Sequence, residues 1–268
     1  NQQVLKVLQY GEIYDQELRL ETIAEASECR NPVIFMERYH KLTFESMERL
    51  KKDFEKFPSF SILDDVYPIS LSEIYDAPVL LFYKGDLNLL KLPKVAVVGS
   101  RSCSQIGTKS VRKVIEELEN ELVVVSGLAR GIDTAAHMSV LQTGGKTIAI
   151  IGTGLDVHYP RSNKRLQEYI GEHHLLLSEY GPGEEPLKYH FPARNRIIAG
   201  LCRGVIVAEA KMRSGSLITC ERAMEEGRDV FAIPSSILDG RSDGCHHLIQ
   251  EGAKLATCGQ DILAEFEF

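Results

Sequence analysis

The loop Gly99-Ser100-Arg101-Ser102 contains the first residues along this chain whose types and spacing could bind a ligand. It follows an apolar run at 95–98 and precedes a helical pattern at 108–119. Serine hydroxyls, a guanidinium and the free amides at a helix N-terminus can together hold an oxyanion. The loop therefore predicts an anion site. It is neither a Walker A loop nor a dinucleotide GxGxxG loop, because the required lysine and glycine spacings are absent.

Basic residues recur after five successive apolar runs. The arginines in these positions are Arg101, Arg130, Arg161, Arg194, Arg196 and Arg213. Polar neighbours in the same segments are Lys164, Asn195, Ser214 and Gly215, together with Tyr159, whose ring could stack on a base. Because the carboxyl ends of parallel strands meet at one edge of a sheet, we expect a basic rim around a cleft there. Such a rim suits a nucleic-acid backbone.

The segment after the second apolar run argues against a nicotinamide-dependent dehydrogenase. Dinucleotide-binding domains usually place an acidic residue there for the ribose hydroxyls. This chain has Ser126-Gly127 and then Arg130. Asp133, a few residues later, is predicted to cap the next helix.

Groups that could catalyse a reaction are few. The sequence has neither a GxSxG elbow nor an HExxH motif. Ser100 or Ser102 could pair with His137 as nucleophile and base, but His137 lies in a helical stretch and we expect it to pack. Glu179 and Glu209 both end apolar runs and could form an acid–base pair, although orienting arginines or backbone amides is the commoner role. We predict no catalytic residue and no cofactor.

Alternating apolar runs and helical patterns extend from residue 94 to the end of the chain. Strands are expected at 95–98, 122–125, 147–151, 175–177, 205–208 and 230–233. Helices are expected at 108–119, 133–142, 163–170, 194–202, 217–226 and 244–251. This alternation predicts an α/β, Rossmann-like fold with a doubly wound, mainly parallel sheet.

The part before residue 94 has a different pattern. Residues 1–57 show short helical periodicities and predict a small all-helical module. Residues 58–93 contain four prolines and one strand candidate at 78–83, and we treat them as a transitional segment of the domain at 58–268.

Charge and cysteine usage narrow the class of protein. The net charge of −7 argues against a generally basic nucleic-acid binder. Residues 1–93 have 11 basic and 16 acidic groups, whereas residues 94–268 have 20 and 22, so any basic patch must be local. Six scattered cysteines without a CxxC pair predict reduced thiols in the cytoplasm and no zinc site. No apolar run is long enough for membrane insertion.

Four motifs together resemble the DNA processing protein A family, also called DprA or Smf. They lie at 97–101, 126–133, 191–198 and 214–219, and the resemblance extends over about residues 60–268. It is strongest toward streptococcal members, and the N-terminal helices resemble the sterile-alpha-motif-like module of some members.

The resemblance implies a function. Members bind single-stranded DNA during natural transformation, protect incoming strands, help to load the RecA recombinase and form homodimers, and no catalysis is established for them. Carried over to this sequence, Arg101 and Arg161 are the first candidates for DNA contact. The full set of expected contacts is Gly99, Ser100, Arg101, Ser102, Arg130, Arg161, Lys164, Arg194, Asn195, Arg196, Ser214 and Gly215. Some members have an aromatic residue near the position of Lys164 for base stacking, and this sequence departs from that pattern.

A late helix and the turn after it raise the question of a homodimer interface. His246, Ile249 and Leu255 lie on a late helix and turn, where they could complete the core or face a second copy, and we favour the second copy. The adjacent His246-His247 pair lacks a third ligand nearby and predicts no metal site.

The rival function is a nucleotide- or phosphoribosyl-processing enzyme, in which Glu179 or Glu209 would be catalytic. A third possibility is a protein-interaction scaffold that uses the N-terminal helices.

Overall fold

The computed structural model describes residues 54–266 and seven positions before them: Ile23, Val33, Met36, Glu37, Glu48, Lys51 and Lys52. The helical module predicted at 1–57 thus lies almost entirely outside the described residues.

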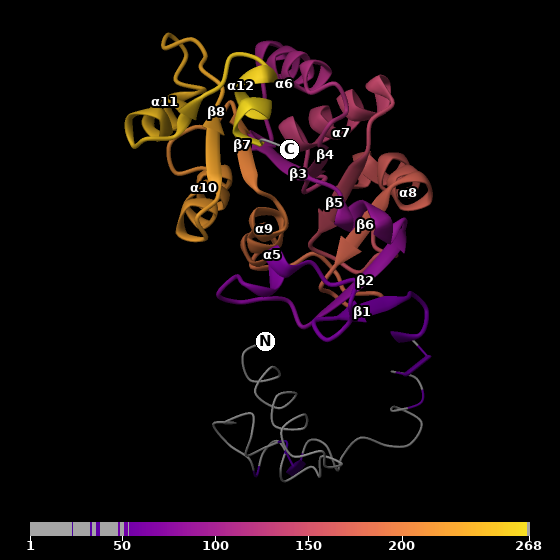
Figure 1. Ribbon diagram of the computed structural model, residues 1–268. Helices are drawn as coiled ribbons and strands as arrows, with labels where there is room; N and C mark the ends of the chain where they lie inside the picture. Colours follow the sequence, from indigo (N-terminus) through magenta and orange to yellow (C-terminus); the bar gives the residue numbers. More distant parts are fainter. Residues whose placement is uncertain are drawn as a thin grey trace.

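One sheet of nine strands organises the described residues (Figure 1). Its spatial order is β1-β2-β6-β5-β4-β3-β7-β8-β9. β1 and β2 pair antiparallel, β2 pairs antiparallel with β6, and the other neighbours are parallel. The strands are β1 (Ser59–Ser61), β2 (Leu80–Gly85), β3 (Lys94–Gly99), β4 (Val123–Ser126), β5 (Thr147–Ile151), β6 (Leu175–Ser178), β7 (Gly204–Ala208), β8 (Asp229–Ala232) and β9 (Lys254–Leu255).

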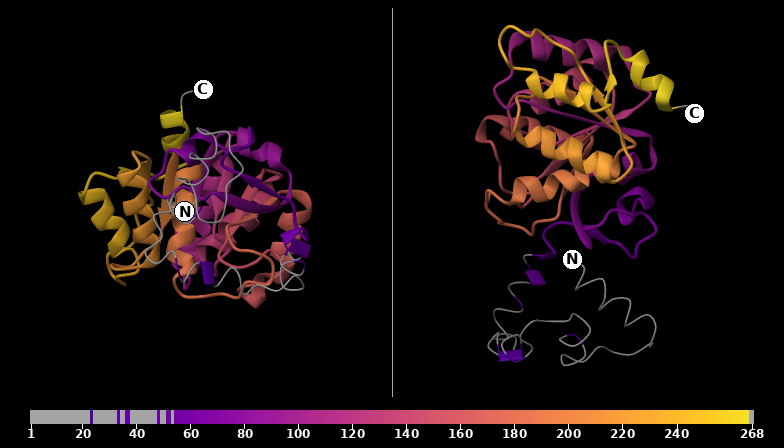
Figure 2. Two further views of the ribbon diagram at one scale, coloured as in Figure 1. Left: turned by 90° about the horizontal axis from the view of Figure 1, so that it is seen from below. Right: turned by 90° about the vertical axis from the view of Figure 1, so that its left-hand side faces the viewer.

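Helices cover both faces of this sheet. They are α5 (Ile69–Ser72), α6 (Gln105–Glu117), α7 (Ile132–Thr143), α8 (Lys164–His173), α9 (His190–Leu201), α10 (Gly215–Glu225), α11 (Asp243–Gln250) and α12 (Gln260–Leu263), with short 3-10 turns η1 (Leu87–Lys91), η2 (Arg161–Asn163) and η3 (Ala264–Phe266). Side chains alternate between faces along a strand. Val98 therefore belongs to the core cluster that includes residues of α5, α9, α10 and α11, while Val97 belongs to the cluster that includes residues of α6, α7 and α12. In the right-hand view of Figure 2, α10 and α11 face the viewer in front of the sheet.

The fold class predicted from the sequence is confirmed: this is an α/β protein with a doubly wound, mainly parallel sheet. β5 is buried along its whole length, which explains why its limits matched the apolar run at 147–151. The segment at 58–93 contributes β1, α5 and β2 to the same architecture.

Several predicted helix starts were wrong, including those of α6, which begins at Gln105 rather than at residue 108, and α10, which begins at Gly215 rather than at residue 217. α9 begins at His190 rather than at residue 194, because Pro192 lies in its first turn, where the missing N–H group has no intrahelical partner to lose. Asp133 is not the N-cap of α7. Gly131, with φ of 77°, holds that position, and Asp133 is the second helical residue.

The direction of winding reverses at β3. β4 lies on one side of β3 and β7 on the other. Ligand sites in doubly wound sheets lie beyond the carboxyl ends of the strands at such a reversal. The loops after β3, β4, β5 and β7 meet there.

Candidate nucleic-acid interface

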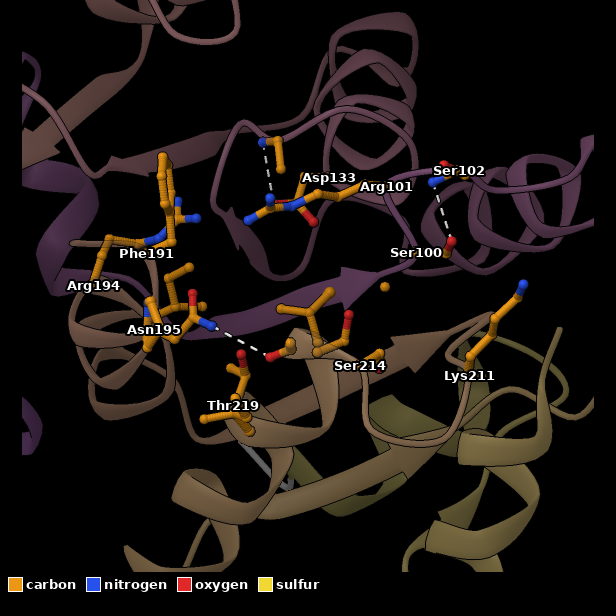
Figure 3. A pocket seen from close by; sticks show the side chains of 18 of the residues that line it. Ser100, Arg101, Ser102, Asp133, Phe191, Arg194, Asn195, Lys211, Ser214 and Thr219 are labelled. Carbon is orange, nitrogen blue, oxygen red and sulfur yellow. Dashed lines mark hydrogen bonds between the residues drawn. The ribbon is translucent and has the colours of Figure 1, made fainter. Parts of the chain in front are cut away.

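A cleft of about 920 Å³ opens at the carboxyl ends of β3, β4 and β7, and we call it the strand-end cleft (Figure 3). Eight of the expected contact residues line it: Gly99, Ser100, Arg101, Ser102, Arg194, Asn195, Ser214 and Gly215. Cations that the sequence analysis did not select also line it: Lys188, Lys211 and Arg241. Arg241 follows β8 in a polar loop, so its position after a strand was the signal that could have identified it.

The Gly99-Ser100-Arg101 loop is held between the end of β7 and the start of α7. A Cβ atom at Gly99 would lie 2.0 Å from the carbonyl oxygen of Ala208 on β7, so glycine is required there. The amide of Ser100 donates to the carbonyl of Glu209 at 2.9 Å, and the Ser100 carbonyl accepts from the amide of Ile132 at 3.1 Å. The loop is therefore fixed while Arg101 remains exposed.

Arg101 extends from this loop toward Phe191 (Figure 3). Its guanidinium carbon lies 5.3 Å from the centroid of the Phe191 ring, in cation–π contact. The ring of Tyr159 lies beside Phe191, with the two centroids 5.3 Å apart. The cleft thus combines an exposed cation with two aromatic rings.

Glu209 positions the start of α6. Its carboxylate accepts hydrogen bonds from the amide of Ser104 at 2.8 and 2.9 Å and from the Ser104 hydroxyl at 2.6 Å. The Ser104 hydroxyl oxygen in turn accepts from the amide of Gly107 at 3.0 Å, which caps the helix. Two of the amides expected to bind an oxyanion at this N-terminus are thus already used. The expectation that Glu209 orients a backbone amide is confirmed.

The N-terminus of α10 opens into the cleft instead. Ser214, Gly215 and Ser216 begin this helix and all line the cleft, beside Lys211. Ser214 makes no side-chain capping hydrogen bond, and its buried hydroxyl has no hydrogen-bond partner among the described residues. Amides at the start of an 11-residue helix carry a partial positive charge. This end of α10 can therefore hold a phosphate oxygen facing Arg101.

Arg194 lies in the floor of the cleft rather than on its surface. Its side chain is buried, and Nη1 donates to the carbonyls of Gly127 and Ile150. Burial lowers the pKa of Arg194 to about 10, although the nearby Asp133 carboxylate opposes this shift. Burial likewise raises the pKa of Asp133, against the effect of Arg194. Arg194 thus ties the ends of β4 and β5 to α9.

Arg196 does not line the cleft. Its Nη2 donates to both carboxylate oxygens of Glu179, at 2.6 and 2.9 Å, and its Nε donates to Asp76 at 3.0 Å. Burial alone would lower the pKa of Arg196, but these carboxylates raise it. The expectation that Glu179 orients an arginine is confirmed.

The remaining expected contacts do not line the cleft. Arg130 lines a smaller hollow that adjoins it. Arg161 and Lys164 are exposed at the start of α8, where the Lys164 ammonium lies 3.8 Å from Glu168, and neither lines the cleft or the hollow. Among the described residues, no group of three or more His, Cys, Asp or Glu side chains is placed to hold a metal ion.

His137 does not form the catalytic pair considered for Ser100 or Ser102. It is fully buried, and its Nδ1 lies 2.7 Å from the hydroxyl oxygen of Thr147. That hydroxyl donates to the Val124 carbonyl at 2.7 Å, so its oxygen accepts the proton on Nδ1. Nε2 is then unprotonated and has no partner among the described residues. The expectation that His137 packs is confirmed.

We expect His137 to make the fold sensitive to acid. Burial, reinforced by the positive charges of His174 and Arg194, lowers the pKa of His137 from 6.5 to about 3. The unfolded chain therefore binds this proton first as the pH falls below about 6.5, and stability drops by about 1.4 kcal/mol per pH unit toward pH 3. Urea unfolding of the wild type and of His137→Asn at pH 7.5, 6 and 5 measures this. The slope of the free energy of unfolding against pH should be smaller in the variant by about 1.4 kcal/mol per pH unit, the effect of one proton. An unchanged slope would assign the acid sensitivity to other groups.

The comparisons with known proteins agree with this architecture. Residues 59–267 match the family model described as DNA recombination-mediator protein A, and residues 1–47 match the DNA processing protein A sterile alpha motif domain. The chain belongs to the DNA processing protein A family. The resemblance and the sterile-alpha-motif-like character predicted for the N-terminal part are thereby confirmed, while the domain boundary at 57/58 stays a prediction.

Relatives of the DprA family cover most or all of the chain. DNA processing protein DprA of Streptococcus pneumoniae is 78% identical over 268 residues, which is 100% of this chain and 94% of that protein. The protein of the same name from Bacillus subtilis is 46% identical over 201 residues, covering 74% of this chain and 68% of its own length.

Two solved DprA structures are similar to the chain. The X-ray structure of the Streptococcus pneumoniae protein has a TM-score of 0.96 and covers 100% of this chain and 93% of that one. A structure from Helicobacter pylori, which concerns that protein's single-stranded DNA binding mode, has a TM-score of 0.71 at 30% identity, covering 79% of this chain and 96% of that one. Within the described part of this chain, no helix is both long and apolar enough to cross a membrane.

Proposed function

We propose that this DprA-family protein binds single-stranded DNA in the strand-end cleft and catalyses no reaction on it. The observation that carries the proposal is the convergence of Arg101 with the uncapped start of α10 across one cleft. A cation and a helix N-terminus facing each other suit the phosphates of a strand. The likeness to the Helicobacter pylori protein supports single-stranded DNA as the ligand.

The placement of each residue refines the proposed contacts. Within the cleft, the strand would contact Gly99, Ser100, Arg101, Ser102, Asn195, Ser214 and Gly215. Outside the cleft, it would contact Arg130, Arg161 and Lys164. Arg194 and Arg196 are buried or paired, so we assign them to positioning α9 rather than to direct contact.

The rival enzyme function has little support in this geometry. Both carboxylates that it would need are engaged: Glu179 with Arg196, and Glu209 with Ser104. Titration with adenosine monophosphate separates the two functions, because an enzyme of that class would bind the mononucleotide and turn it over. A strand-binding protein would bind it weakly and leave it unchanged.

We expect the affinity for oligo-dT to fall steeply with salt. Four exposed cations line the cleft: Arg101, Lys188, Lys211 and Arg241. If each neutralises one phosphate, log Kd should change with log salt concentration with a slope of magnitude about 3, since single strands give about 0.7 per phosphate. Fluorescence anisotropy over a series of salt concentrations measures the slope. An affinity that does not depend on salt would contradict binding through phosphate contacts in the cleft. Duplex DNA of equal length serves as the comparison.

The finer aspects of the function are also part of the proposal. Family membership supports a role in natural transformation, in which the protein protects incoming strands and helps to load the RecA recombinase in the cytoplasm. The proposed partners are therefore single-stranded DNA, RecA and a second copy of the chain.

The proposed homodimer interface lies at an edge of the sheet. Leu255 is half-exposed on β9, the last strand in the sheet order. Ile249 is partly buried against the core from α11, and His246 Nε2 lies 3.0 Å from the Ser235 carbonyl. An open strand edge with an exposed leucine is a surface that a second copy can cover.

Leu255→Arg should convert the dimer to a monomer without unfolding it. An exposed leucine contributes little to the monomer, whereas a buried, unpaired arginine at an interface costs several kcal/mol. Multi-angle light scattering measures the mass. Leu63→Arg, at a leucine of similar exposure near β1, is the matched control and should leave the mass unchanged. A dimeric Leu255→Arg would place the interface elsewhere.

A further inference from the structure

The segment 235–241 joins β8 to α11 at the surface, and we call it the β8–α11 loop. Residues 235–239 are all exposed. At the tip, Ile237 is 80% exposed and Leu238 is 91% exposed, more than any other large apolar side chain in the described part of the chain. Two adjacent apolar side chains in water gain free energy when another surface covers them. The tip therefore indicates a binding partner.

Arg241 anchors this loop at the strand-end cleft, which its side chain lines. Its Nη1 donates to the Ser102 carbonyl at 3.3 Å and lies 3.6 Å from the Glu209 carboxylate. Among the described residues, no other side chain of the loop forms a hydrogen bond or ion pair outside the loop. The side-chain anchor is thus at the loop after β3 and not at β9, where we propose the homodimer interface. This continuity with the cleft favours the DNA strand as the partner of the tip.

The contacts of Arg241 can be exchanged at little cost. Charge-assisted N–H···O bonds are usually about 2.7–2.9 Å long, whereas those to Ser102 and Glu209 measure 3.3 and 3.6 Å. The Glu209 carboxylate already accepts from the amide and hydroxyl of Ser104, so it does not depend on Arg241. The Arg241 side chain is also half-exposed. A phosphate in the cleft can therefore bind this guanidinium more closely than its present partners do.

The tip lies close enough to Arg241 to contact the same strand. Leu238 precedes Arg241 by three residues, so their Cα atoms are at most about 11 Å apart. Gly240, between them, has φ of 64°, and a Cβ atom there would meet only the Asp243 carboxylate, so nothing from the sheet confines this turn. Isoleucine and leucine side chains can pack on bases that are not stacked on their neighbours. A base next to a phosphate held by Arg241 is thus within reach of the tip.

We propose that the β8–α11 loop is a strap that closes over the strand in the cleft. Arg241 exchanges the Ser102 carbonyl for a phosphate, and Ile237 and Leu238 then cover the adjoining bases. The inference rests on the proposed single-stranded DNA function and adds a contact to the bases from outside the cleft. Because the bases of a duplex are paired and stacked, this contact also favours a single strand over a duplex.

The first test uses a fluorescent reporter at the tip. The chain has no tryptophan, so Ile237→Trp introduces a single one. Its emission should be that of an indole in water, and saturating oligo-dT should quench it and shift it to the blue. A strand of the same length with every base removed should leave it unchanged. Ile69→Trp on α5, at an isoleucine that is 76% exposed and does not line the cleft, is the matched control and should not respond to either strand.

The second test measures affinity by fluorescence anisotropy of labelled strands. Replacing both tip residues, Ile237→Ser with Leu238→Ser, should lower the affinity for oligo-dT about tenfold, because two apolar side chains lose a surface to cover. The affinity for the abasic strand should stay at the wild-type value, which also shows that the variant is folded. Arg241→Gln should weaken the binding of both strands, because it removes a phosphate contact.

The outcomes separate the strap from the DNA-binding function. Unchanged emission of Ile237→Trp at a saturation that anisotropy verifies, or full oligo-dT affinity in the double serine variant, would overturn the strap. Emission that depends on protein concentration without DNA would assign the tip to a second copy and overturn the strap as well. If the wild type bound neither strand, the proposed function itself would be rejected.

Discussion

Arg101→Glu is expected to lower the affinity for oligo-dT by about 100-fold or more. The substitution removes a charge-assisted contact of about 1.5–3 kcal/mol and places a carboxylate against the phosphates at the centre of the cleft. Each 1.4 kcal/mol is a tenfold change in Kd, so the two effects together reach this loss. Anisotropy titration at one low salt concentration measures it, because low salt keeps the weak variant within range.

Two controls separate this local effect from general ones. Arg101 is exposed, so thermal melting should show little change in stability. Arg112→Glu makes the same change in net charge on α6, at an arginine that pairs with Glu116 and does not line the cleft. Near wild-type affinity in Arg101→Glu would reject the cleft as the binding site. An equal loss in Arg112→Glu would show that only net charge matters.

The position of the cleft could be predicted from the sequence because it depends on topology. Apolar runs such as 147–151 identify buried parallel strands, and the loops after such strands must share one edge. The loop at Gly99 was found in this way. β1 and β9 were not predicted as strands, because strands of three and two residues at the edges of a sheet carry too little apolar periodicity.

The orientation of individual arginines could not be predicted in the same way. Arg194 and Arg196 were both expected to contact DNA, but they are two residues apart on α9, and side chains at that spacing point to different sides of a helix. Arg194 turns inward to Gly127, while Arg196 turns to Glu179 and Asp76. Asp76 is 120 positions away in sequence, so nothing local indicated that pair.

The role of the Glu209 carboxylate could not be predicted from the sequence either. Glu209 directly follows β7 and is a candidate acid or base by its sequence, yet its partner is Ser104 at the start of α6, 105 positions earlier. A carboxylate at a strand end has the same local sequence whether it performs chemistry or holds a helix. Only the contact across β3 and β7 decides between these roles.

Gly127→Ala is expected to destabilise the fold by about 2–4 kcal/mol and to weaken DNA binding with it. A Cβ atom at Gly127 would lie 2.2 Å from Nη1 of Arg194 and 2.5 Å from its Cζ, so the guanidinium must move. A surface side chain could move at little cost, but Arg194 is 3% exposed and donates to two carbonyls in the floor. Displacing it leaves a buried cation and its acceptors unpaired, which costs several kcal/mol.

Urea unfolding measures the effect, and Gly181→Ala is its matched control. An alanine Cβ there would meet only Phe54, at 3.7 Å, which is ordinary contact. The stability of Gly181→Ala should therefore stay within about 0.5 kcal/mol of the wild type.

A double-mutant cycle then tests whether Arg194 is the cause of the loss in Gly127→Ala. Arg194→Met keeps a long side chain on α9 but removes the guanidinium and its bonds to the ends of β4 and β5. In that background the added methyl at Gly127 meets a flexible apolar chain, so its cost should fall well below that in the wild type, with a coupling energy of about 1–3 kcal/mol. Additive losses would instead place the strain in the backbone of the β4 loop. Because Arg194 also lines the cleft, a coupled result would mean that the stability of the floor of the proposed DNA site depends on this buried cation.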